Sequence, residues 1–92
     1  MARRVPRPRP LTKAELGRLE IQGKTWRAIV GANIRKARTA ADLSLDQLSA
    51  RCDVSANYLS QAERGKRGVT IDVLARVAFA LNMPPADFLI QE

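Results

Sequence analysis

The sequence contains no histidine and a single cysteine, Cys52, among its 92 residues. Without histidine, no imidazole is present to act as a general base, to activate the thiol or to complete a common zinc site. One cysteine cannot form an internal disulfide. No glycine-rich phosphate loop and no suitably paired carboxylates stand out either. The sequence therefore argues against an enzyme and predicts neither a metal ion nor a cofactor; we interpret Cys52 as a core residue.

Long apolar runs are also absent, and aromatic residues are few. No run of about 18 apolar residues is present, so we expect no membrane span. The basic start is followed by prolines, which does not fit a signal peptide. The hydrophobic content of 46% is that of one small globular domain. We expect a cytoplasmic protein of bacterial, phage or mobile-element origin, with dimerisation as a supplement to its small core.

The charge is mostly positive and is unevenly placed. The net charge is +7, from 16 Lys and Arg residues against nine Asp and Glu residues. Residues 1–27 carry eight of the cations and two of the acids, whereas residues 28–92 are almost balanced. A basic segment on a nearly neutral domain suggests a polyanionic partner, most simply nucleic acid.

The N-terminal third divides into two expected segments. In residues 1–10 arginine alternates with proline, which predicts a disordered basic arm because proline interrupts helices and like charges repel. Such an arm could follow phosphates, enter a minor groove or simply keep the protein soluble. Residues 11–24 carry a complete helix start, with Thr12 as N-cap and Glu15 closing a capping box. We expect an extension helix here, ending near Gly23.

The remaining residues, 25–92, predict an all-α domain of five helices. A helix from Thr25 to about Ala40 has an apolar stripe, with Trp26 expected to cover the edge of the core. Two short helices follow between residues 44 and 67. A further helix runs to about Leu81, and a last one begins after two prolines. Three adjacent apolar residues stand near the C-terminal end, Phe88, Leu89 and Ile90, and their number suggests a dimer interface.

The stretch from residue 44 to residue 67 predicts two short helices joined by a sharp turn. Ser44 and Ser55 are both placed as N-caps, and Gly65 is placed to end the second helix. On that second helix, one face carries mainly polar side chains at helical spacing: Ala56, Asn57, Ser60, Gln61 and Arg64. Amides and arginine are groups that read base edges, and the basic residues that follow, Lys66 and Arg67, suit phosphates. The alternative is an ordinary solvated helix face.

These residues resemble the helix-turn-helix domain of the XRE family, the lambda-repressor and Cro type. The string Tyr-Leu-Ser-Gln-x-Glu-Arg-Gly-Lys at residues 58–66 is the most specific part. The resemblance covers roughly residues 28–90, through Ser44, Leu48, residues 54–55, 58–61 and 63–67, Leu74, and residues 77–78 and 80–81.

The resemblance implies roles for particular residues. The resemblance places base contacts on Ala56, Asn57, Ser60 and Gln61, and the polar face of the helix adds Arg64; at Ala56 a thymine methyl contact and a simple gap remain open. We expect phosphate contacts from Ser44, Tyr58, Lys66, Arg67 and Arg35, where Arg35 is taken from the basic character of its stretch and not from the resemblance. A half-buried packing role is the alternative for Tyr58. The resemblance also implies an ion pair between Arg38 and Glu63 that holds the first domain helix against the reading helix.

Three functions follow from these observations. The first is a sequence-specific regulator of transcription that binds palindromic operators in double-stranded DNA as a homodimer, similar to small Cro-like and restriction–modification controller proteins. This resemblance also implies that it regulates its own gene. The second is an antitoxin-like protein-interaction module. The third is a DNA binder without sequence preference.

Overall fold

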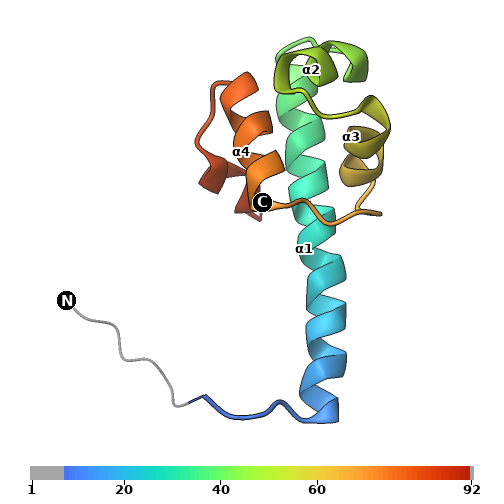
Figure 1. Cartoon of the computed structure of the whole chain (residues 1–92), viewed down its shortest axis with the longest axis vertical. Helices are drawn as coiled ribbons and strands as arrows, with labels where there is room; N and C mark the ends of the chain where they lie inside the picture. Colours follow the sequence, from blue (N-terminus) through green and yellow to red (C-terminus); the bar gives the residue numbers. More distant parts are fainter. Residues whose placement is uncertain (1–7, 92) are drawn as a thin grey trace, which may run out of the picture.

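The structure, a computed structural model, describes residues 8–91 and is all-α over this range (Figure 1). Its elements are α1 (Lys13–Ala40), α2 (Leu45–Cys52), α3 (Ala56–Glu63), α4 (Ile71–Ala80) and the short 3-10 helix η1 (Pro85–Leu89). The expected all-α class is confirmed. Most of the predicted basic arm, residues 1–7, lies outside the described residues.

Each α-helix begins at a hydroxyl cap that the sequence predicted. The side chains of Thr12, Ser44, Ser55 and Thr70 each accept a hydrogen bond from the backbone N–H three residues later. At Thr12 and Ser44 the bond is reciprocated by the third residue's side chain, which completes a capping box. Local chemistry therefore sets where these helices start.

The first helix differs from the prediction. The expected extension helix and first domain helix are one continuous helix of 28 residues, so the separate N-terminal helix and the count of five helices are not found. Gly23 lies inside α1 and does not end it. A single interior glycine costs only about 1 kcal/mol relative to alanine, and no proline follows to break the ladder. The Thr25 hydroxyl donates to the carbonyl of Ile21, 3.1 Å away, which accommodates a second weak helix former.

The hydrophobic core surrounds only the C-terminal half of α1. Buried side chains come from all five elements and from the loops before and after α2, and the largest fully buried ones are Phe88, Ile34, Leu48, Leu59 and Val77. The first buried residue of α1 is Val30, and the helix extends beyond the domain on its N-terminal side (Figure 1). Trp26, which we expected at the core edge, lies on this extension about half exposed.

The C-terminal segment closes the core. Phe88 is fully buried, so it cannot belong to the dimer interface that the sequence suggested; only Leu89 and Ile90 are on the surface. The Asn33 side-chain amide donates to the carbonyls of Phe88 and Ile90, at 2.8 and 2.9 Å. These bonds hold the last described turn against α1.

Candidate nucleic-acid interface

Helix α3 packs against α1 with the two backbones in very close contact. A Cβ atom added to Gly31 would lie 2.1 Å from the carbonyl oxygen of Ala62 and 2.9 Å from that of Glu63. No side chain fits this gap, so glycine is required for the two backbones to meet. The Arg38 guanidinium donates to both carboxylate oxygens of Glu63, and its third bond goes to the carbonyl of Leu43. The pair raises the pKa of Arg38.

A three-residue connection, residues 53–55, sets the angle between α2 and α3. Asp53 ends α2 in the left-handed conformation, with φ of 56°, and Ser55 already caps α3. Val54 between them is buried, and so is Cys52 at the end of α2. Burial raises the pKa of the Cys52 thiol, as expected for a core cysteine. The sharp turn therefore rests on the core as the sequence predicted.

The polar face of α3 points away from the core. Leu59 and Ala62 face inward and are buried. Of the proposed base-reading residues, Asn57 and Arg64 are exposed, and Ala56, Ser60 and Gln61 are partly exposed. Nε of Arg64 donates to the carbonyl of Ser60, 3.3 Å away, so its guanidinium lies along the helix. Five side chains suited to base contacts thus line one accessible surface.

Tyr58 and Arg67 form a contact that the sequence did not reveal. The Arg67 guanidinium carbon lies 4.3 Å from the centre of the Tyr58 ring, and the Tyr58 hydroxyl donates to the carbonyl of Gly68 at 3.2 Å. Because that hydrogen is already used, Tyr58 cannot donate to a phosphate in this arrangement. Its ring instead supports Arg67 through a cation–π contact. In this arrangement Tyr58 packs against Arg67, which is exposed, and a phosphate contact by Tyr58 stays a prediction.

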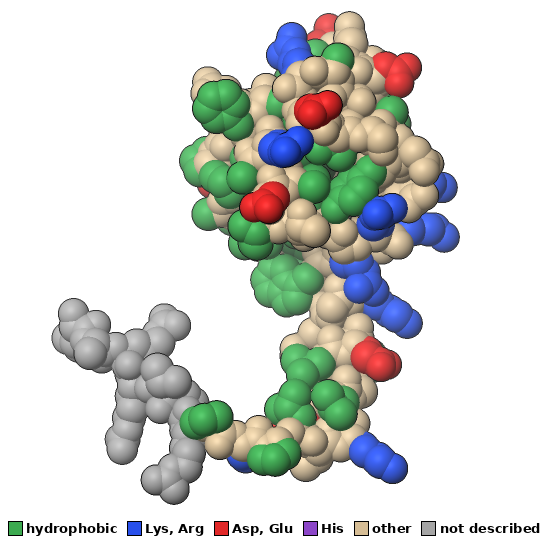
Figure 2. Space-filling model, in the orientation of Figure 1, with side chains coloured by type: hydrophobic (Ala, Val, Ile, Leu, Met, Phe, Trp, Pro, Cys, Tyr) green, Lys and Arg blue, Asp and Glu red, His purple; other side chains and the backbone are tan. Residues whose placement is uncertain are grey.

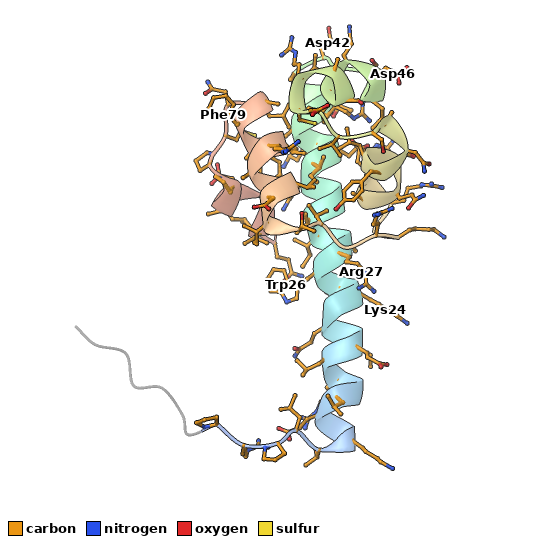
Figure 3. All side chains as sticks on the ribbon, in the orientation of Figure 1. Lys24, Trp26, Arg27, Asp42, Asp46 and Phe79 are labelled. Atoms are coloured by element: carbon orange, nitrogen blue, oxygen red, sulfur yellow. The ribbon has the colours of Figure 1, made fainter. Side chains whose placement is uncertain are left out.

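Two further cations join this surface from α1. Lys24 and Arg27 project from α1 on the side of α3, whereas Trp26 projects on the opposite side (Figure 3). A Cβ atom at Gly68 would lie 3.6 Å from Cδ of Arg27, so Arg27 lies beside the loop that follows α3. Neither residue was expected at this surface, because the helix end expected near Gly23 puts Lys24 and Arg27 in different segments. Their spacing of three residues on one continuous helix was the available signal.

The remaining phosphate candidates come from three parts of the chain. The Ser44 hydroxyl accepts from the Gln47 backbone at 3.1 Å, which leaves its own hydrogen available at the N-terminus of α2. Lys66 is exposed in the loop after α3, and Arg35 is exposed on α1, one turn beyond Gly31. Blue side chains accordingly gather on the α3 side of the molecule (Figure 2). We name this set the basic surface: Lys24, Arg27, Arg35, Arg64, Lys66 and Arg67.

Two other features, a metal-binding cluster and a membrane-spanning helix, are not found among the described residues. Between residues 8 and 91, no three His, Cys, Asp or Glu side chains are grouped so that they could hold a metal ion. In the same range, no helix has the length and apolar character needed to cross a membrane.

Several known proteins are similar to this chain in sequence or in fold. Residues 34–88 match the helix-turn-helix family HTH_3. Control protein C.BamHI of Bacillus amyloliquefaciens is 33% identical over 64 residues, covering 68% of this chain and 79% of that protein. The restriction-modification controller protein C.AhdI from Aeromonas hydrophila superposes with a TM-score of 0.66 at 29% identity, covering 67% of this chain and 94% of that one.

Longer relatives share the same segment. The clp gene regulator ClgR from Corynebacterium glutamicum superposes with a TM-score of 0.67 at 38% identity, over 70% of this chain and 68% of that one. An HTH-type transcriptional regulator of Mycobacterium tuberculosis is 47% identical over 53 residues, and the match spans 58% of this chain and only 38% of that regulator.

Proposed function

The chain belongs to the HTH_3 family of DNA-binding helix-turn-helix transcriptional regulators, the Cro/C1 or XRE type, and from that membership we propose that it binds a two-fold symmetric operator as a homodimer. The family is non-enzymatic. The observation that carries the proposal is the outward face of α3, which gathers amide, hydroxyl and guanidinium groups beside a basic surface. Such a helix, with its N-terminal residues at the base edges, suits a major groove.

We assign the contacts in two groups. Asn57 and Gln61 are the principal base readers, since each amide offers both a donor and an acceptor, and Ala56, Ser60 and Arg64 lie on the same face. The basic surface and the Ser44 hydroxyl hold phosphates and set the register of the protein on the duplex. Arg38 and Glu63 do not touch DNA; they position α3.

The proposed target is an operator with two half-sites. Two copies related by a two-fold axis present two α3 helices, which read half-sites with centres about 10 base pairs apart or a multiple of that. The exposed pair Leu89 and Ile90 is one candidate contact between copies. Because two similar proteins are described as control or controller proteins, the proposal includes an operator near the promoter of the chain's own gene.

Selection from a random DNA library tests this function. The full chain should enrich a pseudo-palindrome with half-sites about one helical turn apart. A library that yields no motif, together with tight and salt-sensitive binding, would identify a DNA binder without sequence preference. Absence of any binding at low salt would favour the protein-interaction module.

A further inference from the structure

The exposed half of α1 carries an apolar stripe that no part of the described chain covers. Leu16, Leu19 and Trp26 are 49%, 47% and 48% exposed. With Gly23 they follow one another at spacings of three and four residues, so they share one face of the helix. Hydrophobic side chains gather on this part of α1 in Figure 2, below the domain.

The stripe is a direct continuation of the core face of the same helix. The next residues at this spacing are Val30 and Ile34, which are buried inside the domain. Apolar or glycine positions therefore recur every three or four residues from Leu16 to Ile34, and only the part from Val30 onward is covered. This face of α1 is therefore buried at its C-terminal end and exposed at its N-terminal end. A second helix packed along it would cover the exposed part.

We propose that the occupant is the same segment of a second copy of this chain, paired antiparallel. The exposed segment begins at the cap Thr12 and ends where Val30 enters the core, so its midpoint is residue 21. Pairing about that midpoint places Leu16 of each copy opposite Trp26 of the other, and Leu19 opposite Gly23. The pairing forms four layers of facing residues, and in two of them Leu19 of one copy packs against Gly23 of the other. It covers the whole exposed segment of α1.

The position of α3 supports the antiparallel arrangement. Gly31, which contacts α3, follows Val30 directly and so lies about 100° around the helix from the stripe. The two-fold axis of an antiparallel pair is perpendicular to the plane of the two helices, which is also a quarter turn from the stripe. Both α3 helices therefore lie on the same side of the dimer, together with Lys24 and Arg27.

The separation of the two reading helices also fits. Gly31 is ten residues from the midpoint, which at 1.5 Å per residue puts the two α3 contacts about 30 Å apart along the helix axis. One turn of DNA separates half-sites by about 34–36 Å. This last step rests on the proposed function, whereas the pairing of the helices does not.

A parallel pair is disfavoured on two grounds. Its two-fold axis runs along the helices and would turn the α3 helices to opposite sides, where they could not reach one duplex. It would also place Glu15 of each copy next to Glu20 of the other, at the flanking positions where like charges repel.

Sedimentation of the full chain at micromolar concentration, without DNA, tests the interface. Leu19→Asp should raise the dimer dissociation constant about 100-fold or more, because a carboxylate would enter the apolar stripe on both copies. Ile21→Asp is the matched control: Ile21 is 67% exposed on the opposite face of α1 and should leave the constant unchanged. Circular dichroism should show both variants equally folded.

Ile90→Asp separates this interface from the C-terminal surface. If Ile90→Asp dissociates the dimer and Leu19→Asp does not, or if the wild-type chain sediments as a monomer, the inference is overturned while operator binding can still hold. If the helices pair as proposed but the library selection yields no motif, the proposed function fails and the inference stands.

The direction of pairing has its own measurement. Spin labels at Lys13→Cys, in a Cys52→Ala background, should lie far apart in the dimer, since the two Lys13 Cα atoms are about 26 Å apart when antiparallel and about 10–15 Å apart when parallel. A short distance would overturn the antiparallel arrangement.

Discussion

Arg38 on α1 and Glu63 at the end of α3 are joined by two hydrogen bonds, Nε to Oε2 at 2.7 Å and Nη2 to Oε1 at 3.0 Å. The two side chains are only 13% and 6% exposed. The pair is therefore nearly buried, and together with the close approach at Gly31 it fixes α3 on α1. The position of α3, and with it the geometry of the basic surface, depends on these two contacts between α1 and α3.

Glu63→Gln should lower the free energy of unfolding by about 3 kcal/mol, because Arg38 keeps its charge in a nearly buried site without its partner. Replacing both residues, as Arg38→Met with Glu63→Leu, should recover part of the loss, since no unpaired charge remains. Urea unfolding of the two variants and the wild type measures this. A double variant no more stable than Glu63→Gln would contradict the account.

Gly31→Ala should destabilise the protein by about 3 kcal/mol and weaken DNA binding, because the new methyl group meets backbone oxygens that cannot rotate away. The matched control is Gly17→Ala on the exposed half of the same helix, where an added Cβ meets nothing within 4 Å. That change should stabilise by about 0.5–1 kcal/mol through helix propensity. Equal effects at the two glycines would rule out the close packing of α1 on α3.

Much of the molecule could be predicted from sequence because its local signals are strong. Hydroxyl caps and the turn at residues 53–54 set the helix starts, and the spacing of Leu59 and Ala62 oriented the face of α3. Gly23 was misread because a propensity of about 1 kcal/mol is weak beside the continuity of a long helix. The burial of Phe88 rather than its neighbours, and the contact of Arg67 with Tyr58, depend on tertiary packing that no local pattern records.

The start of α1 should show an unusual response to acid. Arg9 donates two hydrogen bonds to Glu15, at 2.8 and 2.7 Å, and this contact, helped by the Thr12 backbone, lowers the pKa of Glu15 to about 2. Because the pKa is depressed in the folded chain, the stabilisation is fully present above the ordinary value of 4.5 and is lost as the pH falls through 2. NMR titration should place the Glu15 midpoint near 2, and Arg9→Ala should raise it. A midpoint above 4 in the wild type would show that the contact does not persist in solution.

Lys24 should contribute to DNA binding without affecting specificity. It projects on the α3 side, and one phosphate contact accounts for about 0.9 of the slope of log affinity against log salt. Lys24→Ala should make the slope shallower by that amount and weaken all operators alike. Arg18→Ala, which removes an exposed cation from a different face of the same half of α1, is the control and should leave the slope unchanged. Equal slopes for both variants would place the DNA elsewhere.

Asn57 and Gln61 should carry much of the base discrimination. They lie one turn apart on the outward face of α3, and each amide can donate to and accept from adenine in the major groove. A bidentate contact is worth about 1–3 kcal/mol against the wrong base, so Gln61→Ala should flatten the preference at one or two operator positions by that amount. Lys66→Ala, in the exposed loop after α3, should instead weaken all sequences alike.

A competition assay over every single-base variant of the operator distinguishes these two effects. Neither Asn57→Ala nor Gln61→Ala should change the unfolding free energy by more than about 0.5 kcal/mol, because neither side chain is part of the core. If both variants lower the affinity for every sequence by the same factor, the two amides only position the protein. Discrimination would then have to come from Arg64, from Ser60 or from the shape of the DNA itself.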